Sequence, residues 1–205
     1  MQLIGMLDSP YVRRVAVSLQ LLGLPFEHRS VSVFRGFDEF SRINPVVKAP
    51  TLICDDGEAI MDSSLIIQFI ESKHTRSLWS GDPAERQHEF RAVSLALAAC
   101  DKSVQIVYER NLRPKEAQYE PWMERVTGQV LAAYSGLEAQ VKSKHGIFSG
   151  ALNQASISAA VAWQFTQSML AAVVPAAKHP GLVEISKRLE ATPEFRKYPP
   201  VGPGV

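Results

Sequence analysis

The stretch from Asn44 to Ser64 constrains the fold of this 205-residue chain more than any other. After an Asn-Pro turn, a short apolar strand, Thr51 to Cys54, directly follows Pro50. Asp56-Gly57 then indicates a hairpin, because both central residues of a type I′ turn need positive φ, and Glu58 to Met61 would pair back. The stretch therefore predicts a β-hairpin that leads at once into an apolar helix.

Two features of this stretch suit a peptide-like ligand. A proline at the start of a strand is tolerated where its missing N–H faces away from the ladder. If the Ala49–Pro50 bond is cis, the Ala49 backbone turns outward, and its N–H and C=O can pair with an extended peptide. At the next helix start, the Asp62 carboxylate can bind an ammonium group, while the Ser63 hydroxyl and the free N–H groups can bind a carboxylate. We therefore expect a ligand with a peptide backbone and a free amino-acid end.

These motifs resemble those of the glutathione transferase superfamily. That family shows Asn-Pro-x-x-Lys-Val-Pro-x-Leu, a hairpin, and then Glu/Asp-Ser before a helix. This chain has Asn44-Pro45-Val46-Val47-Lys48-Ala49-Pro50-Thr51-Leu52 and then Asp62-Ser63. Ala49 replaces the commoner Val or Ile at a position that acts through its backbone. The alternative is that Pro50 is only an edge proline and Ser63 only a helix cap.

The order of the expected elements in the first part of the chain agrees with this resemblance. A strand at 2–6 is followed by a helix with Ser9 as N-cap, Pro10 at its first position and Gly23 after its end. A strand at 25–33, a helix at 37–43, the hairpin and the apolar helix complete the order β-α-β-α-β-β-α. This is the thioredoxin-like order, and the resemblance implies the same fold.

The rest of the chain is predicted to be helical. We expect an α/β thioredoxin-like, glutathione-binding domain at residues 1–75, a breaker-rich linker at 76–83 and an all-helical C-terminal domain at 84–205. Asn153 is a suitable N-cap for the central helix of that second domain. Ser156 stands where the family has Asp, so we expect the reciprocal bond of the capping box to be weak or absent.

Composition narrows the class of protein. The net charge of +1 gives no reason to expect a nucleic-acid surface or a polybasic membrane patch. Cys54 and Cys100 lack the spacing of a disulfide framework or a zinc site, and the five His residues show no ligand spacing, so no metal is expected. The N-terminus lacks a signal-peptide layout, and the longest apolar run, 169–177, contains a proline and is too short to span a bilayer. We therefore expect a cytoplasmic protein.

Ser9 is the candidate catalytic residue. The thiol of glutathione has an ordinary pKa of about 8.5, and a hydroxyl donor at a helix N-terminus stabilises the thiolate. The pattern from Ser9 to Arg13, Ser-Pro-Tyr-Val-Arg, resembles the bacterial Ser-Pro-Phe/Tyr-Val-Arg group of the family. The alternative is that Ser9 only caps the helix. Tyr11 is a weaker candidate for the same role.

The resemblance also implies how the remaining residues of the glutathione site act. Lys48 would approach the glycine carboxylate, and Asp62 and Ser63 would hold the γ-glutamyl end. Ala49 would pair its backbone with the cysteinyl part, and Pro50 beside it belongs to the same glutathione site. The alternative for Lys48 is an ordinary solvated lysine.

A second-substrate pocket is expected beside the glutathione site. Its candidate residues are Tyr11, Phe34, Gln105, Tyr108 and Trp163. Aromatic residues at helical spacing are more often core, which is the alternative. In related proteins an acidic residue at the place of Asp101 can reach the neighbouring subunit's site; a plain surface or capping role is the alternative. Family members usually pair the first domain of one subunit with the second domain of the other, so the resemblance also implies a homodimer.

The resemblance implies a glutathione S-transferase that transfers glutathione to a small hydrophobic electrophile, as in detoxification. A glutathione-dependent peroxidase or disulfide reductase is one alternative, and a non-catalytic interaction module with the same fold is another. A helix-cap Ser9 in place of a Cys favours thiolate stabilisation over mixed-disulfide chemistry.

Overall fold

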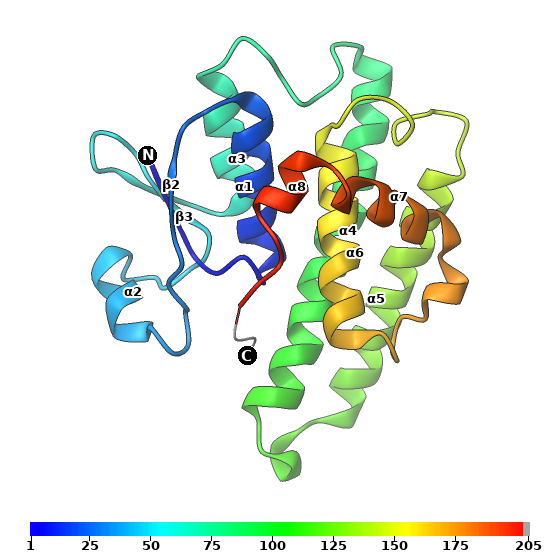
Figure 1. The fold of residues 1–205 in the computed structure, drawn as a ribbon. Helices are drawn as coiled ribbons and strands as arrows, with labels where there is room; N and C mark the ends of the chain where they lie inside the picture. The colour runs from blue at the N-terminus through cyan, green and yellow to red at the C-terminus, as the bar shows by residue number, and fades with distance from the viewer. Residues whose placement is uncertain (203–205) are drawn as a thin grey trace. The chain divides into compact units, whose positions relative to one another are not determined.

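The computed structural model describes residues 1–202 of the chain, and its contacts divide these residues into two compact units (Figure 1). Among the described residues, the first unit contains Met1–Leu78 together with residues 192–202, and the second contains Trp79–Ala191. The second domain is expected from the sequence to extend to residue 205, and residues 203–205 lie outside the described part.

The first unit is a four-stranded mixed sheet with helices. Its strands are β1 (Gln2–Ile4), β2 (Glu27–Arg29), β3 (Thr51–Ile53) and β4 (Ala59–Met61), in the spatial order β2-β1-β3-β4. Strand β1 is parallel to β2 and antiparallel to β3, and β3 is antiparallel to β4. The helices are α1 (Pro10–Leu22), α2 (Phe37–Ile43) and α3 (Ser63–Ser72). Helices α1 and α3 pack together on one side of the sheet, and α2 lies on the other (Figure 1). The thioredoxin-like fold of this unit is therefore confirmed.

Helix α1 begins and ends where its sequence predicts. The Ser9 side chain accepts a hydrogen bond from the Val12 N–H, and Pro10 occupies the first helical position. Gly23 adopts a left-handed conformation with φ of 70°, and its N–H donates to the last carbonyls of the helix. Because the ten buried residues of α1 cover most of its surface, the helix is held by packing as well as by its caps.

The hairpin exists, but its predicted turn type is wrong. Gly57 has a positive φ of 89°, whereas Asp56 is not among the non-glycine residues with positive φ in the described chain. The Gly57 N–H donates to the Cys54 carbonyl at 3.0 Å, and the Cys54 N–H donates to the Glu58 carbonyl at 2.8 Å. This is a three-residue loop with a left-handed glycine at its end. Only the glycine takes the conformation that is costly for a side chain.

The second unit is helical. Its main helices are α4 (Pro83–Leu112), α5 (Glu120–Val141), α6 (Gln154–Leu170) and α7 (Pro180–Glu190), with single 3₁₀ turns at Lys115–Ala117 and Ala176–Lys178. Helix α4 packs against both α5 and α6, and α6 also packs against α7. Across residues 1–202, no helix combines the length and apolar character that crossing a membrane requires.

A buried chain of hydroxyl groups joins three helices of the second unit. The Tyr134 hydroxyl donates to the Ala162 carbonyl at 2.9 Å and lies 2.6 Å from the Thr166 hydroxyl, which lies 2.8 Å from that of Ser103. Since the single phenol hydrogen goes to Ala162, Thr166 donates to Tyr134 and Ser103 donates to Thr166. Every member is then bonded, as a buried polar network requires.

The end of the chain belongs with the first unit, although the sequence placed it with the helical domain. Helix α8 (Pro193–Lys197) packs against α1. The buried Arg13 donates from Nε to the Tyr198 carbonyl at 2.8 Å, and its guanidinium lies 5.3 Å from the centre of the Phe195 ring. The ring of Tyr198 stacks on that of Phe26, with the ring centres 5.4 Å apart. A pattern of local spacing does not reveal contacts between residues so far apart in sequence.

The capping box at the start of α6 is complete: of the expectation that the reciprocal bond is weaker or absent, its absence is wrong. Asn153 accepts from the Ser156 N–H at 2.8 Å, and the Ser156 hydroxyl accepts from the Asn153 N–H at 3.1 Å. A serine hydroxyl is shorter than a carboxylate side chain but still reaches the capped N–H.

We predict that Ser156→Ala lowers the free energy of unfolding by about 1 kcal/mol, because the Asn153 N–H loses its partner. Ser158→Ala is the matched control. Ser158 is buried in the same helix, and its hydroxyl has no hydrogen-bond partner in the described part of the chain. Urea denaturation should show a lower midpoint for Ser156→Ala only. Equal midpoints for both variants would mean that the reciprocal bond contributes nothing.

Candidate functional site

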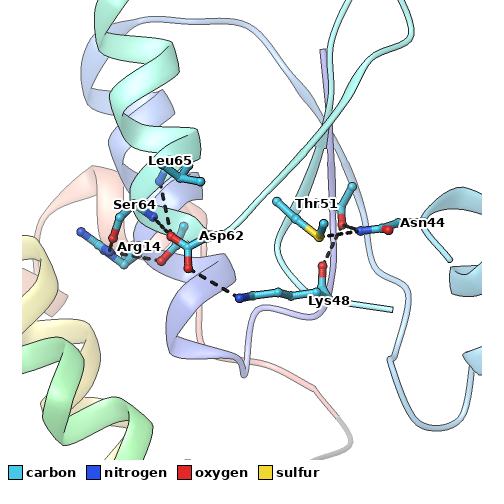
Figure 2. A network of polar contacts seen from close by, with 9 residues as sticks. Arg14, Asn44, Lys48, Thr51, Asp62, Ser64 and Leu65 are labelled. Carbon is cyan, nitrogen blue, oxygen red and sulfur yellow. Dashed lines mark hydrogen bonds and ion pairs between the residues drawn. The ribbon is translucent and has the colours of Figure 1, made fainter. Parts of the chain in front are cut away.

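The loop between α2 and β3 is braced by one buried side chain. Asn44 donates from Nδ2 to the Thr51 hydroxyl at 2.9 Å (Figure 2). Its Oδ1 accepts from the Val46 N–H at 3.0 Å. The Thr51 hydroxyl in turn donates to the Lys48 carbonyl at 2.7 Å. These bonds tie both ends of the loop to the start of β3, so the backbone between them has a defined course.

Ala49 lies within this braced loop and presents its backbone. The Ala49–Pro50 peptide bond is cis, Pro50 is buried, and Ala49 is half-buried. Among residues 1–202, neither the N–H nor the C=O of Ala49 is engaged in a hydrogen bond. Gly5 allows the close approach of α1 and this loop, since a Cβ on Gly5 would lie 2.6 Å from Val12 and 3.1 Å from the Ala49 side chain. The N–H and C=O of Ala49 are thus not used by the described part of the chain, and pairing with an extended peptide stays a prediction.

The Asp62 carboxylate caps α3. Asp62 has a positive φ of 74°, and its Oδ1 accepts from the N–H groups of Ser64 at 2.9 Å and Leu65 at 3.4 Å (Figure 2). The Asp62 carbonyl accepts from the Ile66 N–H at 2.9 Å. Of the N–H groups in the first turn of α3, that of Ser63 is the one without a partner in the described chain. Fewer N–H groups are therefore open to a ligand carboxylate than the sequence indicated.

The second oxygen of Asp62 faces Lys48. The distance from Lys48 Nζ to Asp62 Oδ2 is 3.6 Å, and the two side chains are 51% and 45% exposed (Figure 2). An exposed pair of this kind is worth about 0–1 kcal/mol, so either group can leave the other for a ligand at little cost. Lys48 thus lies beside the residue expected to hold the γ-glutamyl ammonium.

Arg14 donates hydrogen bonds to the hydroxyl groups at the start of α3. Arg14 is 3% exposed and donates from one nitrogen, Nη1, to the hydroxyls of Ser63 and Ser64, each at 3.1 Å (Figure 2). Sequence reasoning assigned Arg14 no role. The available signal was a charged residue on the buried face of a helix, which is uncommon unless the charge is bonded.

Ser9 keeps a donor while it caps α1. Its hydroxyl oxygen accepts from the Val12 N–H at 3.5 Å, a long and weak bond. The hydroxyl hydrogen has no acceptor in the described chain. Pro10, the next residue, has no N–H. The geometry therefore allows Ser9 to cap the helix and to donate to an anion at the same time.

Cys54 has the properties of a structural cysteine. Burial, together with the charges of Asp56 and Asp55, raises the pKa of the Cys54 thiol. A thiol with a raised pKa is largely protonated near neutral pH and is a poor nucleophile.

The candidates for a second-substrate pocket fall in both units. Tyr11 is half-buried near the start of α1, and Phe34 is 36% exposed after β2. Gln105, Tyr108 and Trp163 belong to the second unit.

Within the second unit these candidates have different surroundings. Trp163 is 3% exposed, and its ring meets those of Tyr134 at 5.4 Å and His179 at 5.5 Å, as a core residue does. Asp101 is exposed, accepts from Gln105 Nε2 at 3.1 Å and pairs with Lys102 at 2.9 Å.

A family model described as the glutathione S-transferase N-terminal domain matches residues 3–78, which contain all the groups described around Ala49 and Ser63. The first unit is therefore similar in sequence to the N-terminal domain of glutathione S-transferases. It is 25% identical over 201 residues to an uncharacterized GST-like protein, YibF, of Escherichia coli, and the match covers 98% of each chain. It is 31% identical over 135 residues to a maleylacetoacetate isomerase of Pseudomonas aeruginosa, which covers 60% of this chain and 63% of the isomerase.

Solved structures of glutathione transferases are similar to this chain along nearly its whole length. A glutathione S-transferase from Methylobacterium radiotolerans, in complex with glutathione sulfonate, has a TM-score of 0.90 and 27% identity, with 100% of this chain and 96% of that chain covered. A glutathione transferase family member from Pseudomonas fluorescens with bound glutathione has a TM-score of 0.85 and 25% identity, with 98% and 99% covered. The chain therefore shares its fold with proteins whose structures hold glutathione or glutathione sulfonate.

We predict that Asn44→Ala lowers the free energy of unfolding of this protein by about 1–3 kcal/mol, since the Val46 N–H and the buried Thr51 hydroxyl each lose a partner. Asn111→Ala is the control, because Asn111 is exposed near the end of α4 and should change stability by no more than about 0.5 kcal/mol. Denaturant unfolding of both variants measures the difference. An Asn44→Ala midpoint equal to the control's would show that the brace is dispensable.

Proposed function

We propose that this chain is a glutathione S-transferase-like enzyme, which binds glutathione, stabilises its thiolate and transfers it to a small hydrophobic electrophile. The observation that carries the proposal is the set of open polar groups in one unit: the Ala49 backbone, the Ser63 N–H and the Ser9 hydroxyl hydrogen. Glutathione is an extended peptide with an amino-acid end and a thiol, and it has a partner for each of these groups.

The γ-glutamyl end binds at the start of α3. Its carboxylate accepts from the N–H and the hydroxyl of Ser63, at the positive end of the helix dipole. Its ammonium group pairs with Asp62, which already lies 3.6 Å from the ammonium of Lys48. The ligand therefore replaces one exposed ion pair with another, and Lys48 is released toward the glycine carboxylate.

The cysteinyl part binds along the braced loop. Its backbone pairs with the N–H and C=O of Ala49, next to Pro50, in the manner of an added strand. Two hydrogen bonds of this type fix the direction of the peptide and bring its thiol toward the start of α1.

Ser9 stabilises the thiolate by hydrogen bonding, without a covalent bond. A hydroxyl donor to an anion, close to a helix N-terminus, lowers the pKa of the thiol. Transfer then consists of attack by this thiolate on the electrophile. Tyr11 and Phe34 in the first unit, and Gln105 and Tyr108 in the second, remain the candidates for contact with that second substrate, and Trp163 is a weaker one because it is a core residue.

The observations on cysteine favour transfer over disulfide reduction or peroxidase chemistry. No Cys occurs among the first ten residues, and the thiol of Cys54 has a raised pKa. A non-catalytic interaction role has no specific observation in its favour. The homodimer, the role of Asp101 at a neighbouring subunit's site, the cytoplasmic location and the role in detoxification stay part of the proposal.

We predict that Ser63→Ala weakens glutathione binding by about tenfold or more, because a hydrogen bond to a charged group is worth about 1.5–3 kcal/mol. Ser72→Ala is the control. Ser72 is exposed at the other end of α3, where its hydroxyl donates to the Phe69 carbonyl. If calorimetric titration gives the same glutathione affinity for both variants, Ser63 does not bind the γ-glutamyl end.

We predict that Ser9→Ala raises the pKa of bound glutathione by about 1–2 units, since one unit corresponds to 1.36 kcal/mol of lost stabilisation of the thiolate. Thiolate absorbance at neutral pH should fall, while glutathione still binds. Ser9→Thr is the control, because it keeps both the cap and the hydroxyl. Unfolding must be measured as well, because loss of an N-cap costs about 1 kcal/mol. An unchanged thiol pKa in Ser9→Ala would leave Ser9 only the role of a cap.

A further inference from the structure

We propose that Arg14 is a positioning residue, which fixes the Ser63 hydroxyl for the α-carboxylate of the γ-glutamyl end and strengthens it as a donor. This inference rests on the proposed function. Arg14 does not itself touch glutathione in this proposal; it acts through the two serines at the start of α3.

The geometry of the guanidinium supports this role. Nη1 of Arg14 carries two hydrogens and lies 3.1 Å from each of the hydroxyl oxygens of Ser63 and Ser64 (Figure 2). Each hydroxyl thus accepts a hydrogen bond from Arg14, so its own hydrogen is directed away from the guanidinium. For Ser63, at the first position of α3, the hydroxyl then donates in the same region as its open N–H.

The charge of Arg14 adds to this effect. A hydroxyl that accepts from a charged donor is polarised and becomes a stronger donor itself. The N-terminus of α3 carries the positive end of the helix dipole. The guanidinium and the dipole therefore act with the same sign on a carboxylate bound to Ser63.

The neighbouring Arg13 provides a matched comparison. It is 1% exposed on the same helix, but it donates to the Tyr198 carbonyl and lies over the Phe195 ring. Two consecutive buried arginines thus have different tasks: Arg13 holds the C-terminal segment, and Arg14 holds the start of α3.

The test compares two ligands and two variants of the full chain by calorimetry. The ligands are glutathione and an analogue in which 4-aminobutyrate replaces the γ-glutamyl residue, which removes only the α-carboxylate. We expect Arg14→Gln to raise the Kd of glutathione about tenfold, or ~1.4 kcal/mol, and to leave the Kd of the analogue unchanged. Arg13→Gln should leave the Kd of both ligands within about twofold, because its contacts are elsewhere.

A double-mutant cycle shows whether Arg14 acts through Ser63. In the Ser63→Ala background, Arg14→Gln should raise the Kd of glutathione by less than about threefold, because the hydroxyl that it positions is gone. Thermal unfolding accompanies each titration. If Arg14→Gln does not fold, Arg14→Lys replaces it in every titration, since it keeps the charge but lacks the planar fork, and should raise the Kd of glutathione about threefold.

The outcomes separate this inference from the proposed function. Wild-type protein that does not bind glutathione would overturn both. Wild-type binding combined with an equal loss of affinity for both ligands, an equal loss in both backgrounds, or no loss at all would overturn the role of Arg14 alone.

Discussion

The carboxylate of Asp62 fixes the point at which β4 turns into α3, and the candidate site depends on that point. A non-glycine residue at a φ of 74° costs of the order of 1–3 kcal/mol. A hydrogen bond to a charged acceptor is worth about 1.5–3 kcal/mol, and Oδ1 of Asp62 accepts one at 2.9 Å from Ser64 and a longer, weaker one at 3.4 Å from Leu65. The caps therefore offset the strain and set Ser63 and Ser64 at the first two helical positions, over Arg14.

Features that act over a few residues could be predicted from the sequence. The Asn-Pro turn, the cap at Ser9 and the helix start at Asp62 each depend on a side chain that bonds its own backbone within three residues. The contact of Arg14 with Ser63 and Ser64 could not be predicted, because these serines lie 49 and 50 positions further along the chain. The same holds for the C-terminal segment, whose bond to Arg13 spans 185 positions.

Two errors of sequence reasoning came from treating residue types as fixed roles. Asp56-Gly57 matched the preferred pair of a type I′ turn, yet one extra residue in the loop lets the glycine alone take positive φ. Ser156 lacked the expected acidic group, yet its hydroxyl accepts from the capped N–H as an acidic side chain would. In both cases the hydrogen-bonding requirement was identified correctly, and a different residue or geometry satisfied it.

At Ser9, the hydrogen bond that the start of α1 requires is compatible with the proposed stabilisation of a thiolate. The cap bond to the Val12 N–H is long, at 3.5 Å, and uses only a lone pair of the oxygen. A thiolate needs the hydrogen, so binding it does not compete with the cap. If the cap had used the hydroxyl as a donor, activation of a thiol would require that bond to break first. Because capping uses the acceptor and the proposed activation uses the donor, one side chain can define where α1 begins and be free to donate to an anion beside it without losing the cap bond.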